Sequence, residues 1–218
     1  MSGMAGAQSE LKPTNRRLES FSDGVFAIVV TIMVIEIQIP DNLAFAGDNA
    51  ALAELAAELV TYALSFLVIA NLWTSHHYLI FTLNMPSRAT IWYNNLLLFA
   101  VSLIPISTRF LGAHPASPRA AAIYGGVGMA CTGAFMLLRS HAARTTHNEL
   151  YRDIHRRVLR LSWLFLGIYA ASVPFAFVSP WLAWICFISV PPMLFLPIIR
   201  AAMSPIVGEH PDLRHSCP

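Results

Sequence analysis

The sequence predicts an all-α, polytopic membrane protein with six transmembrane helices in each subunit and both termini in the cytoplasm. Composition is the first reason: 56% of the 218 residues are hydrophobic, only 12% are charged, and the mean hydropathy is +0.57. Soluble domains carry about 25% charged residues. Because so few charges cannot cover a folded surface in water, the excess apolar surface must face lipid.

Long apolar runs are the second reason, because each approaches the roughly 20 residues that a spanning helix needs. The runs are continuously apolar rather than alternating, and lipid offers no partners to backbone amides. Helices are therefore expected instead of a β-barrel. The six expected spans are Phe21–Ile39, Leu55–Leu83, Ala89–Leu111, Ala120–Leu138, Leu159–Val178 and Trp181–Ile199.

The distribution of basic residues is the third reason. Six spans leave only Arg109 and Arg119, of the 14 Lys and Arg side chains, on the side of the membrane opposite the termini. Basic residues concentrate in cytoplasmic loops, which puts both termini in the cytoplasm. We therefore expect a polar cytoplasmic N-terminus over 1–15, a six-helix transmembrane domain over 16–203 and a cytoplasmic C-terminal tail over 204–218.

The first span opens with charged and polar residues directly before its apolar run. Ser20 and Asp23 fit a capping box that would start the span at Asp23. That start leaves only Gly24–Ile39 to cross the membrane, which is short. A helix that begins near Thr14 or Asn15 instead places Asp23 on an inner turn, where an ionisable group needs a partner from another helix. Both interpretations stay open, although length favours the second.

The second span ends in a stretch that holds Asn71, Trp73, His76 and His77. Trp73 and His77 are four residues apart and share a helix face, whereas His76 points about 100° away. This end lies on the same membrane side as Asp23, so a bridge from Asp23 to Trp73 or a histidine is expected. The alternative is that the histidines simply lie at the membrane interface. A metal site is not expected, because no further ligand cluster accompanies the pair.

The later spans carry signals of helix packing. Prolines in and around the last two spans predict kinks or short helices; they are Pro174, Pro180, Pro191, Pro192 and Pro197. Small residues in the fourth span recur at a spacing of four, which favours close helix contact; they are Gly126, Ala130 and Ala134 in one row, and Gly128 and Thr132 in another.

The longest polar segment, 139–160, joins the fourth and fifth expected spans. One interpretation is a basic patch that touches anionic lipid headgroups. The interpretation we favour is a plain connecting segment whose charges set the orientation of the chain.

A stripe along the first span carries Ile28, Ile32 and Ile35 at helical spacing, with Thr31 beside it. Membrane helices are apolar on every face that meets lipid or another helix. By itself the stripe therefore indicates only helix packing or lipid contact.

Two motifs occur together in the first two spans. One is Arg17-x-x-x-Phe21-Ser22-Asp23, followed by Gly-Val-Phe-Ala-Ile, and the other is the stretch NLWTSHHYLIF that ends at Phe81. In combination they resemble the transmembrane protein 175 family, potassium channels found in prokaryotes and in animal lysosomes. With six spans, the resemblance covers most of the chain.

The resemblance implies an assembly and a pore. Bacterial members carry one six-helix unit and form tetramers in which the first helix lines a central pore, and this chain carries one motif. The implied constriction falls on Ile28, with further pore-facing layers on Thr31, Ile32 and Ile35. The implied polar network that ties the first helix to its neighbours comprises Arg17, Phe21, Ser22 and Asp23, with Asn71, Trp73, His76 and His77 from the second span.

The implied function is a potassium-permeable channel of the prokaryotic cell membrane. A ring of Ile28 side chains offers no oxygen ligands, and the sequence contains no T-V-G-Y-G filter. Ions must therefore shed water to pass, which K⁺ does more easily than Na⁺, so modest selectivity for K⁺ is expected. The expected partners are K⁺, membrane lipid and further copies of the chain, without nucleic acid, cofactor or fixed metal ion.

Three other classes of function compete with the channel. A proton-coupled transporter or proton leak would use Asp23, His76 and His77 as relay groups. A membrane enzyme is not expected, because no Ser/His/Asp set or pair of carboxylates has a suitable spacing. A structural membrane scaffold would conduct no ions in liposomes.

Overall fold

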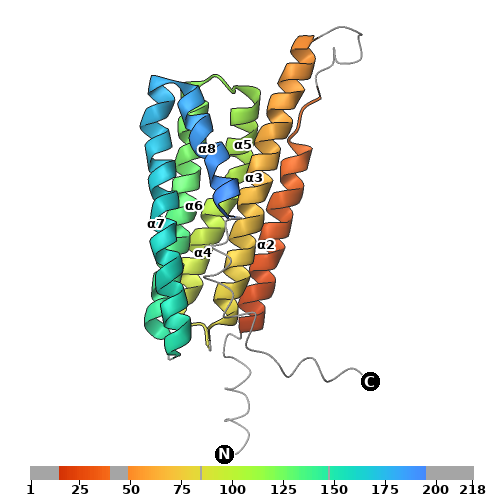
Figure 1. Cartoon of the computed structure of the whole chain (residues 1–218). Coiled ribbons are helices and arrows are strands. Elements are labelled where there is room, and N and C mark those ends of the chain that lie inside the picture. The colour runs from red at the N-terminus through yellow and green to blue at the C-terminus, as the bar shows by residue number, and fades with distance from the viewer. Residues whose placement is uncertain (1–14, 40–48, 84, 147, 195–218) are drawn as a thin grey trace, which may run out of the picture.

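The computed structural model describes residues 15–39, 49–83, 85–146 and 148–194. These residues form a bundle of helices that run roughly along one axis, with α2 and α3 at one edge and α7 at the other (Figure 1). The predicted all-α fold is confirmed. The helices are α2 (Asn15–Ile35), α3 (Asn49–Phe81), α4 (Arg88–Ser102), α5 (Ile104–Ala113), α6 (Pro118–Thr145), α7 (Glu149–Val178) and α8 (Pro180–Leu194).

Five helical segments among the described residues are long and apolar enough to cross a membrane, with α4 and α5 together forming one of them. The sixth, α8, is apolar but shorter over its described part, Pro180–Met193. The predicted sixth span, Trp181–Ile199, runs past residue 194 and so ends outside the described residues. Residues 1–14 and the predicted tail over 204–218 lie outside them as well.

The first helix starts at Asn15 rather than at Asp23. Asp23 therefore lies inside α2, and the interpretation of Ser20 and Asp23 as a capping box is wrong. The Asn15 side-chain amide donates a hydrogen bond to the carbonyl oxygen of Leu83, which joins the beginning of α2 to the chain just after α3. The longer-helix interpretation is confirmed, and the ionisable group inside the helix needs a partner on a neighbour.

The third span is divided into α4 and α5, whereas the sequence analysis predicted one helix over Ala89–Leu111. α4 begins with a capping box, in which the Ser87 hydroxyl accepts from the Thr90 backbone N–H at 3.1 Å. α5 carries Pro105 in its first turn. Proline has no backbone N–H and its ring clashes with the preceding turn, so the helical hydrogen bonding of α4 cannot continue through it.

The contact between α6 and α7 depends on two glycines. A Cβ atom on Gly128 would overlap the ring of Tyr169, and one on Gly125 would overlap the Ser172 hydroxyl. Gly126 faces open space, with nothing within 4 Å of an added Cβ. The predicted small-residue packing is therefore correct for Gly128. In the other predicted row, Gly126 makes no close contact, whereas Ala134 is buried in the core.

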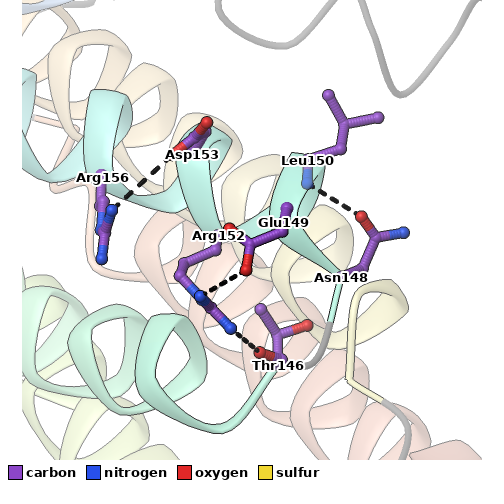
Figure 2. Close-up of polar contacts among 7 residues, drawn as sticks. All are labelled: Thr146, Asn148, Glu149, Leu150, Arg152, Asp153 and Arg156. Carbon is purple, nitrogen blue, oxygen red and sulfur yellow. Dashed lines mark hydrogen bonds and ion pairs between the residues drawn. The ribbon is translucent and has the colours of Figure 1, made fainter.

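The turn between α6 and α7 is held by local polar contacts (Figure 2). The Asn148 side chain caps α7 by accepting from the Leu150 N–H at 2.9 Å. Arg152 donates to the Glu149 carboxylate at 2.7 Å and to the Thr146 carbonyl oxygen at 3.3 Å. These contacts fix where α7 begins, which is ten residues before the predicted fifth span, Leu159–Val178.

The predicted prolines have different effects on the last two helices. Pro174 lies inside α7, and Pro191 and Pro192 lie inside α8. Pro180 opens α8, a position that proline favours because its missing N–H would have no partner there. Pro197 lies outside the described residues.

Candidate functional site

The beginning of α2 lies against the end of α3, and polar side chains join the two helices. Trp73 on α3 donates its indole N–H to Oδ1 of Asp23 at 2.8 Å. His77, one turn further along α3, pairs through Nδ1 with the Glu19 carboxylate at 3.0 Å. The Trp73 and His77 rings stack with their centroids 6.0 Å apart. Trp73 and His77, which are four residues apart on α3, thus bind Asp23 and Glu19, which are four residues apart on the antiparallel helix α2.

A second, buried chain of hydrogen bonds brings in α4. Asn94 donates its side-chain amide to the Ser22 hydroxyl at 3.0 Å, and its carbonyl oxygen lies 2.7 Å from Nε2 of His76. Because that oxygen can only accept, Nε2 of His76 is the donor. Ser22 in turn donates to the Leu18 carbonyl oxygen at 2.8 Å. Ser22, His76 and Asn94 are all fully buried, so these bonds specify how α2, α3 and α4 fit together.

We call these residues the α2–α3–α4 polar cluster: Glu19, Ser22, Asp23, Trp73, His76, His77 and Asn94. The sequence predicted the bridge from Asp23 to the second span, and Trp73 is its partner. It missed Glu19 and Asn94. Glu19 could have been found from its spacing of four to Asp23, which repeats the spacing of Trp73 and His77. Asn94 was a single amide in an apolar run, so its partner depended on how the helices fit together.

Three residues predicted for the network lie elsewhere in the protomer. Arg17 and Phe21 are exposed on the face of α2 that points away from the cluster, and Phe21 is 59% exposed. Asn71 lies two residues before Trp73 and lines a groove formed with α6 and α7. Within one protomer, Arg17, Phe21 and Asn71 therefore do not join Asp23.

The predicted stripe occupies the exposed face of α2. Ile28 is 58% exposed and Ile35 is 78% exposed, and Thr31 and Ile32 between them are exposed too. The opposite face of the helix is buried in the protomer through Leu18, Ser22, Phe26, Val29 and Met33. A helix that is apolar on both faces but packed on only one has a second face that meets lipid or another chain.

Thr31 differs from its neighbours on the stripe because it carries oxygen. Its hydroxyl lies 3.1 Å from the Ala27 carbonyl oxygen and 2.9 Å from that of Ile28. The hydroxyl therefore gives its hydrogen to the helix backbone and presents oxygen lone pairs outward. An oxygen of this kind can accept hydrogen bonds from water or contact a cation.

The other end of α2 is held by charged groups that the sequence analysis did not connect. Arg109 on α5 donates to the Glu36 carboxylate at 3.0 Å, and both side chains are partly exposed. The Gln38 backbone N–H donates to the Glu58 carboxylate on α3 at 2.7 Å. α2 is therefore fixed to its neighbours at both ends, with the stripe between them.

The described residues contain no group of three or more His, Cys, Asp or Glu side chains placed to hold a metal ion. The histidines of the polar cluster instead bind an amide and a carboxylate. The cluster has the composition of a structural hydrogen-bond network with ionisable members.

Comparison with known proteins identifies the family. The sequence profile described as "Endosomal/lysosomal potassium channel TMEM175" matches residues 17–105, which include every residue of the polar cluster and the stripe. A protein of Chryseobacterium sp. (strain P1-3), named a potassium channel, is 30% identical over 173 residues, which cover 78% of this chain and 86% of the relative. The chain belongs to the TMEM175 family.

The fold agrees with this assignment. The crystal structure of a TMEM175 homologue from Chamaesiphon minutus, described as a lysosomal potassium-selective channel homologue, superposes with a TM-score of 0.73 at 27% sequence identity. The superposition covers 86% of this chain and 97% of that one. The chain is a multi-pass membrane protein whose family members and structural neighbours are ion channels rather than enzymes.

The human relative carries a different name. It is named "Endosomal/lysosomal proton channel TMEM175" and is 32% identical over 114 residues, which cover 49% of this chain and 23% of the human protein. The family members similar to this chain are therefore named after two different ions.

Proposed function

We propose that this TMEM175-family chain forms a potassium-permeable channel in the prokaryotic cell membrane, as a homotetramer with a central pore lined by α2. The observation that carries the proposal is the two-faced burial of α2. One face packs into the protomer, while Ile28, Thr31, Ile32 and Ile35 are exposed on the other. The potassium-channel names of the bacterial relatives support the same conclusion.

The constriction is assigned to Ile28. Four branched apolar side chains around an axis narrow the water path and supply no oxygen, so an entering ion loses part of its hydration shell. K⁺ binds its water less tightly than Na⁺ does, so it crosses with the smaller energetic cost. The outward lone pairs of Thr31, one turn further along α2, then provide an oxygen layer for the partly dehydrated ion. Selectivity of this origin is modest.

The polar cluster positions the pore helix in this proposal. Its hydrogen bonds from α3 and α4 set the rotation of α2, and this rotation decides which residues face the axis. Arg17 and Phe21, exposed in the protomer, contact neighbouring copies. Residues 16–203 constitute the channel domain, and residues 1–15 and 204–218 are cytoplasmic.

Flux through purified protein in liposomes tests the function. Under defined gradients of K⁺, Na⁺ and H⁺, we expect a reversal potential that follows K⁺ more closely than Na⁺. Native mass spectrometry should give an assembly of four 24.0 kDa chains. A reversal potential that follows only the proton gradient would contradict the potassium channel.

The Ile28→Asn variant tests the constriction. An amide at this position hydrates the narrowest point, so the preference for K⁺ over Na⁺ should fall. The matched control is Val34→Asn, which makes a similar change in polarity at another exposed position of α2, about 120° from Ile28 around the helix. An unchanged permeability ratio in Ile28→Asn, or an equal change in Val34→Asn, would remove Ile28 from its proposed role.

A proton pathway is the second candidate, and two observations favour it. The vertebrate relatives are named proton channels. In addition, Asp23, His77 and Glu19 are ionisable, partly exposed and lie together on the α2–α3 face. A proton current that survives when K⁺ is absent and falls in His77→Gln would support this candidate. A pH-gradient flux that is the same with and without the protein would exclude it.

A further inference from the structure

Arg139, near the end of α6, is a buried cation. Its side chain is 5% exposed. One guanidinium nitrogen donates to the Ser75 carbonyl oxygen at 3.3 Å, and the guanidinium lies over the Phe135 ring, 4.7 Å from the centroid. The Nε–H is buried and has no hydrogen-bond partner among the described residues. The group therefore has partial contacts on two sides and an unsatisfied donor on a third.

No carboxylate among the described residues forms an ion pair with Arg139. Other arginines at this end of the bundle are different: Arg152 pairs with Glu149 and Arg156 pairs with Asp153, as Figure 2 shows. These two pairs are partly exposed to solvent. Water already stabilises a charge there, so an ion pair contributes little. A buried guanidinium is costly unless an anion and hydrogen-bond acceptors compensate it. The position of Arg139 thus calls for an anion.

His155 lies on α7 near this cation. It is 1% exposed, and its Nε2 lies 3.1 Å from the hydroxyl of Thr82, the residue that follows α3. That hydroxyl already donates to the Leu79 carbonyl oxygen, so Nε2 of His155 is the donor. With its hydrogen on Nε2, the His155 ring presents only a lone pair at Nδ1, which is buried and has no hydrogen-bond partner among the described residues. The buried Nε–H of Arg139 is therefore an unused donor, whereas Nδ1 of His155 is an unused acceptor.

A groove of about 70 Å³ runs along the bundle between α3, α6, α7 and α8, and Arg139 itself is not part of its wall. Ser75 and Phe135, the two residues that contact Arg139, are part of its wall. Further along it is lined mainly by apolar side chains, and the hydroxyl groups of Thr132 and Ser162 bond to their own helix backbones. Several lining residues are half-buried, so the groove reaches the bundle surface.

The groove suits an apolar chain better than water. It is several times larger than the roughly 10–15 Å³ that one water needs, but a stable water also needs two to four polar partners. Arg139 directly follows the predicted span Ala120–Leu138, which is about as long as the hydrocarbon core is thick. The cation therefore lies at headgroup level, with the groove extending from it into the hydrocarbon layer.

We propose that this groove binds one anionic phospholipid per protomer, with an acyl chain between α3, α6 and α7 and its phosphate at Arg139. The phosphate accepts from the Arg139 guanidinium and supplies the negative charge that no described carboxylate provides. The apolar wall packs against the acyl chain. This contact, which a free ion cannot make, gives the site its preference for a lipid. This site lies outside the α2–α3–α4 polar cluster, and the inference is independent of which ion the protein conducts.

Binding to the purified full-length protein in detergent tests the proposal. The probes are phosphatidylglycerol, phosphatidylcholine with the same acyl chains, and inorganic phosphate. We expect native mass spectrometry to detect one retained phosphatidylglycerol per protomer, and the thermal midpoint to rise with phosphatidylglycerol only. Arg139→Gln should weaken phosphatidylglycerol binding by at least about tenfold, because a charge-assisted hydrogen bond is lost.

Two further variants make the result specific. Arg157→Gln removes the same charge from an exposed position of α7 and should leave the affinity within about twofold. Ser162→Leu fills the groove, keeps Arg139 and should also abolish the phosphatidylglycerol effect. This variant keeps the proposal testable even where Arg139→Gln does not fold.

Three outcomes would overturn the proposal. Equal stabilisation by inorganic phosphate would mean a free-anion site, and unchanged phosphatidylglycerol binding in Ser162→Leu would mean that the groove holds no chain. The third concerns Glu209 and Asp212, which lie outside the described residues. The double variant Glu209→Gln with Asp212→Asn could lower the thermal midpoint as much as Arg139→Gln does. If combining all three changes then lowers it no further, the carboxylates and Arg139 act as one pair, and the chain supplies its own anion.

Discussion

The two halves of the bundle are held together in different ways. In the first half, α2, α3 and α4 are joined by hydrogen bonds among Glu19, Ser22, Asp23, Trp73, His76, His77 and Asn94. In the second half, α6 and α7 make close contact through Gly125 and Gly128, which leave room for Ser172 and Tyr169. The family profile matches residues 17–105 and so covers the first half only.

The difference has a physical reason. Apolar contacts in a membrane have little directional preference, because lipid is as apolar as the side chains. Glycine contacts bring two helices together, but a hydrogen bond between helices also fixes rotation and register. α2 needs that fixation because only one of its faces is packed in the chain. The second half serves as the support against which α4 is placed.

The largest expected effect is that of Asn94→Ala. It leaves Nε2 of His76 without an acceptor and creates a cavity between α2, α3 and α4, which should cost about 2–3 kcal/mol. Thermal unfolding in detergent micelles measures the loss. The control is Asn95→Ala, at an exposed neighbouring position, with an expected change below about 0.5 kcal/mol. Equal effects of the two variants would mean that the buried hydrogen bonds do not hold the first half together.

Gly128→Ala tests the second half and should cost about 1–2 kcal/mol, because the new methyl group forces α6 away from the Tyr169 ring. The same thermal assay applies. Gly126→Ala is the matched control on the same helix, where the added methyl meets open space. It should be neutral or stabilising by up to about 1 kcal/mol from helix propensity. Destabilisation by Gly126→Ala alone would reverse the assigned contact face.

Trp73→Phe removes the indole donor to Asp23 with part of the ring, but it retains an aromatic ring beside His77. Hydrogen bonds between membrane helices contribute about 0.6 kcal/mol on average and up to about 1.7 kcal/mol, so we expect a loss in that range. A double-mutant cycle with Asp23→Asn should show coupling between the two changes. The control Trp92→Phe, at a residue 74% exposed on α4, should show none. We also expect Asp23→Asn to weaken the proposed assembly or gating, because the loss of the charge weakens the bond from Trp73 that holds α2.

The smallest expected effect is that of Arg109→Gln. Its ion pair with Glu36 is partly exposed, so its removal should cost about 0.2–1 kcal/mol and less at high salt. Unfolding at two salt concentrations measures this difference. Arg119→Gln, an exposed arginine at the same end of the bundle, is the control. A loss as large as that of Asn94→Ala would show that α2 depends on this end as much as on the polar cluster.

Local spacing was sufficient to predict part of the site. Trp73 and His77 share a face because they are four residues apart, and antiparallel neighbouring spans bring the end of the second to the beginning of the first. A bond from Asp23 to Trp73 or a histidine follows from these two facts, and the structure shows that Trp73 is the partner. The pairing of His76 with Asn94 does not follow, because it depends on the rotation of a third helix. The ion pair of Glu36 and Arg109 was missed for the same reason.

From the sequence alone, we could infer that lipid surrounds this protein, that it is helical and which family it belongs to. Composition requires lipid around the chain, continuous apolar runs require helices, and the two motifs indicate TMEM175. Only the tertiary structure decided which face of α2 is left exposed, which glycine meets α7 and that no described carboxylate pairs with Arg139. In a membrane every helix face is apolar, so the pattern of side chains does not distinguish a packed face from a free one. That distinction arises from the rotation of each helix against its neighbours.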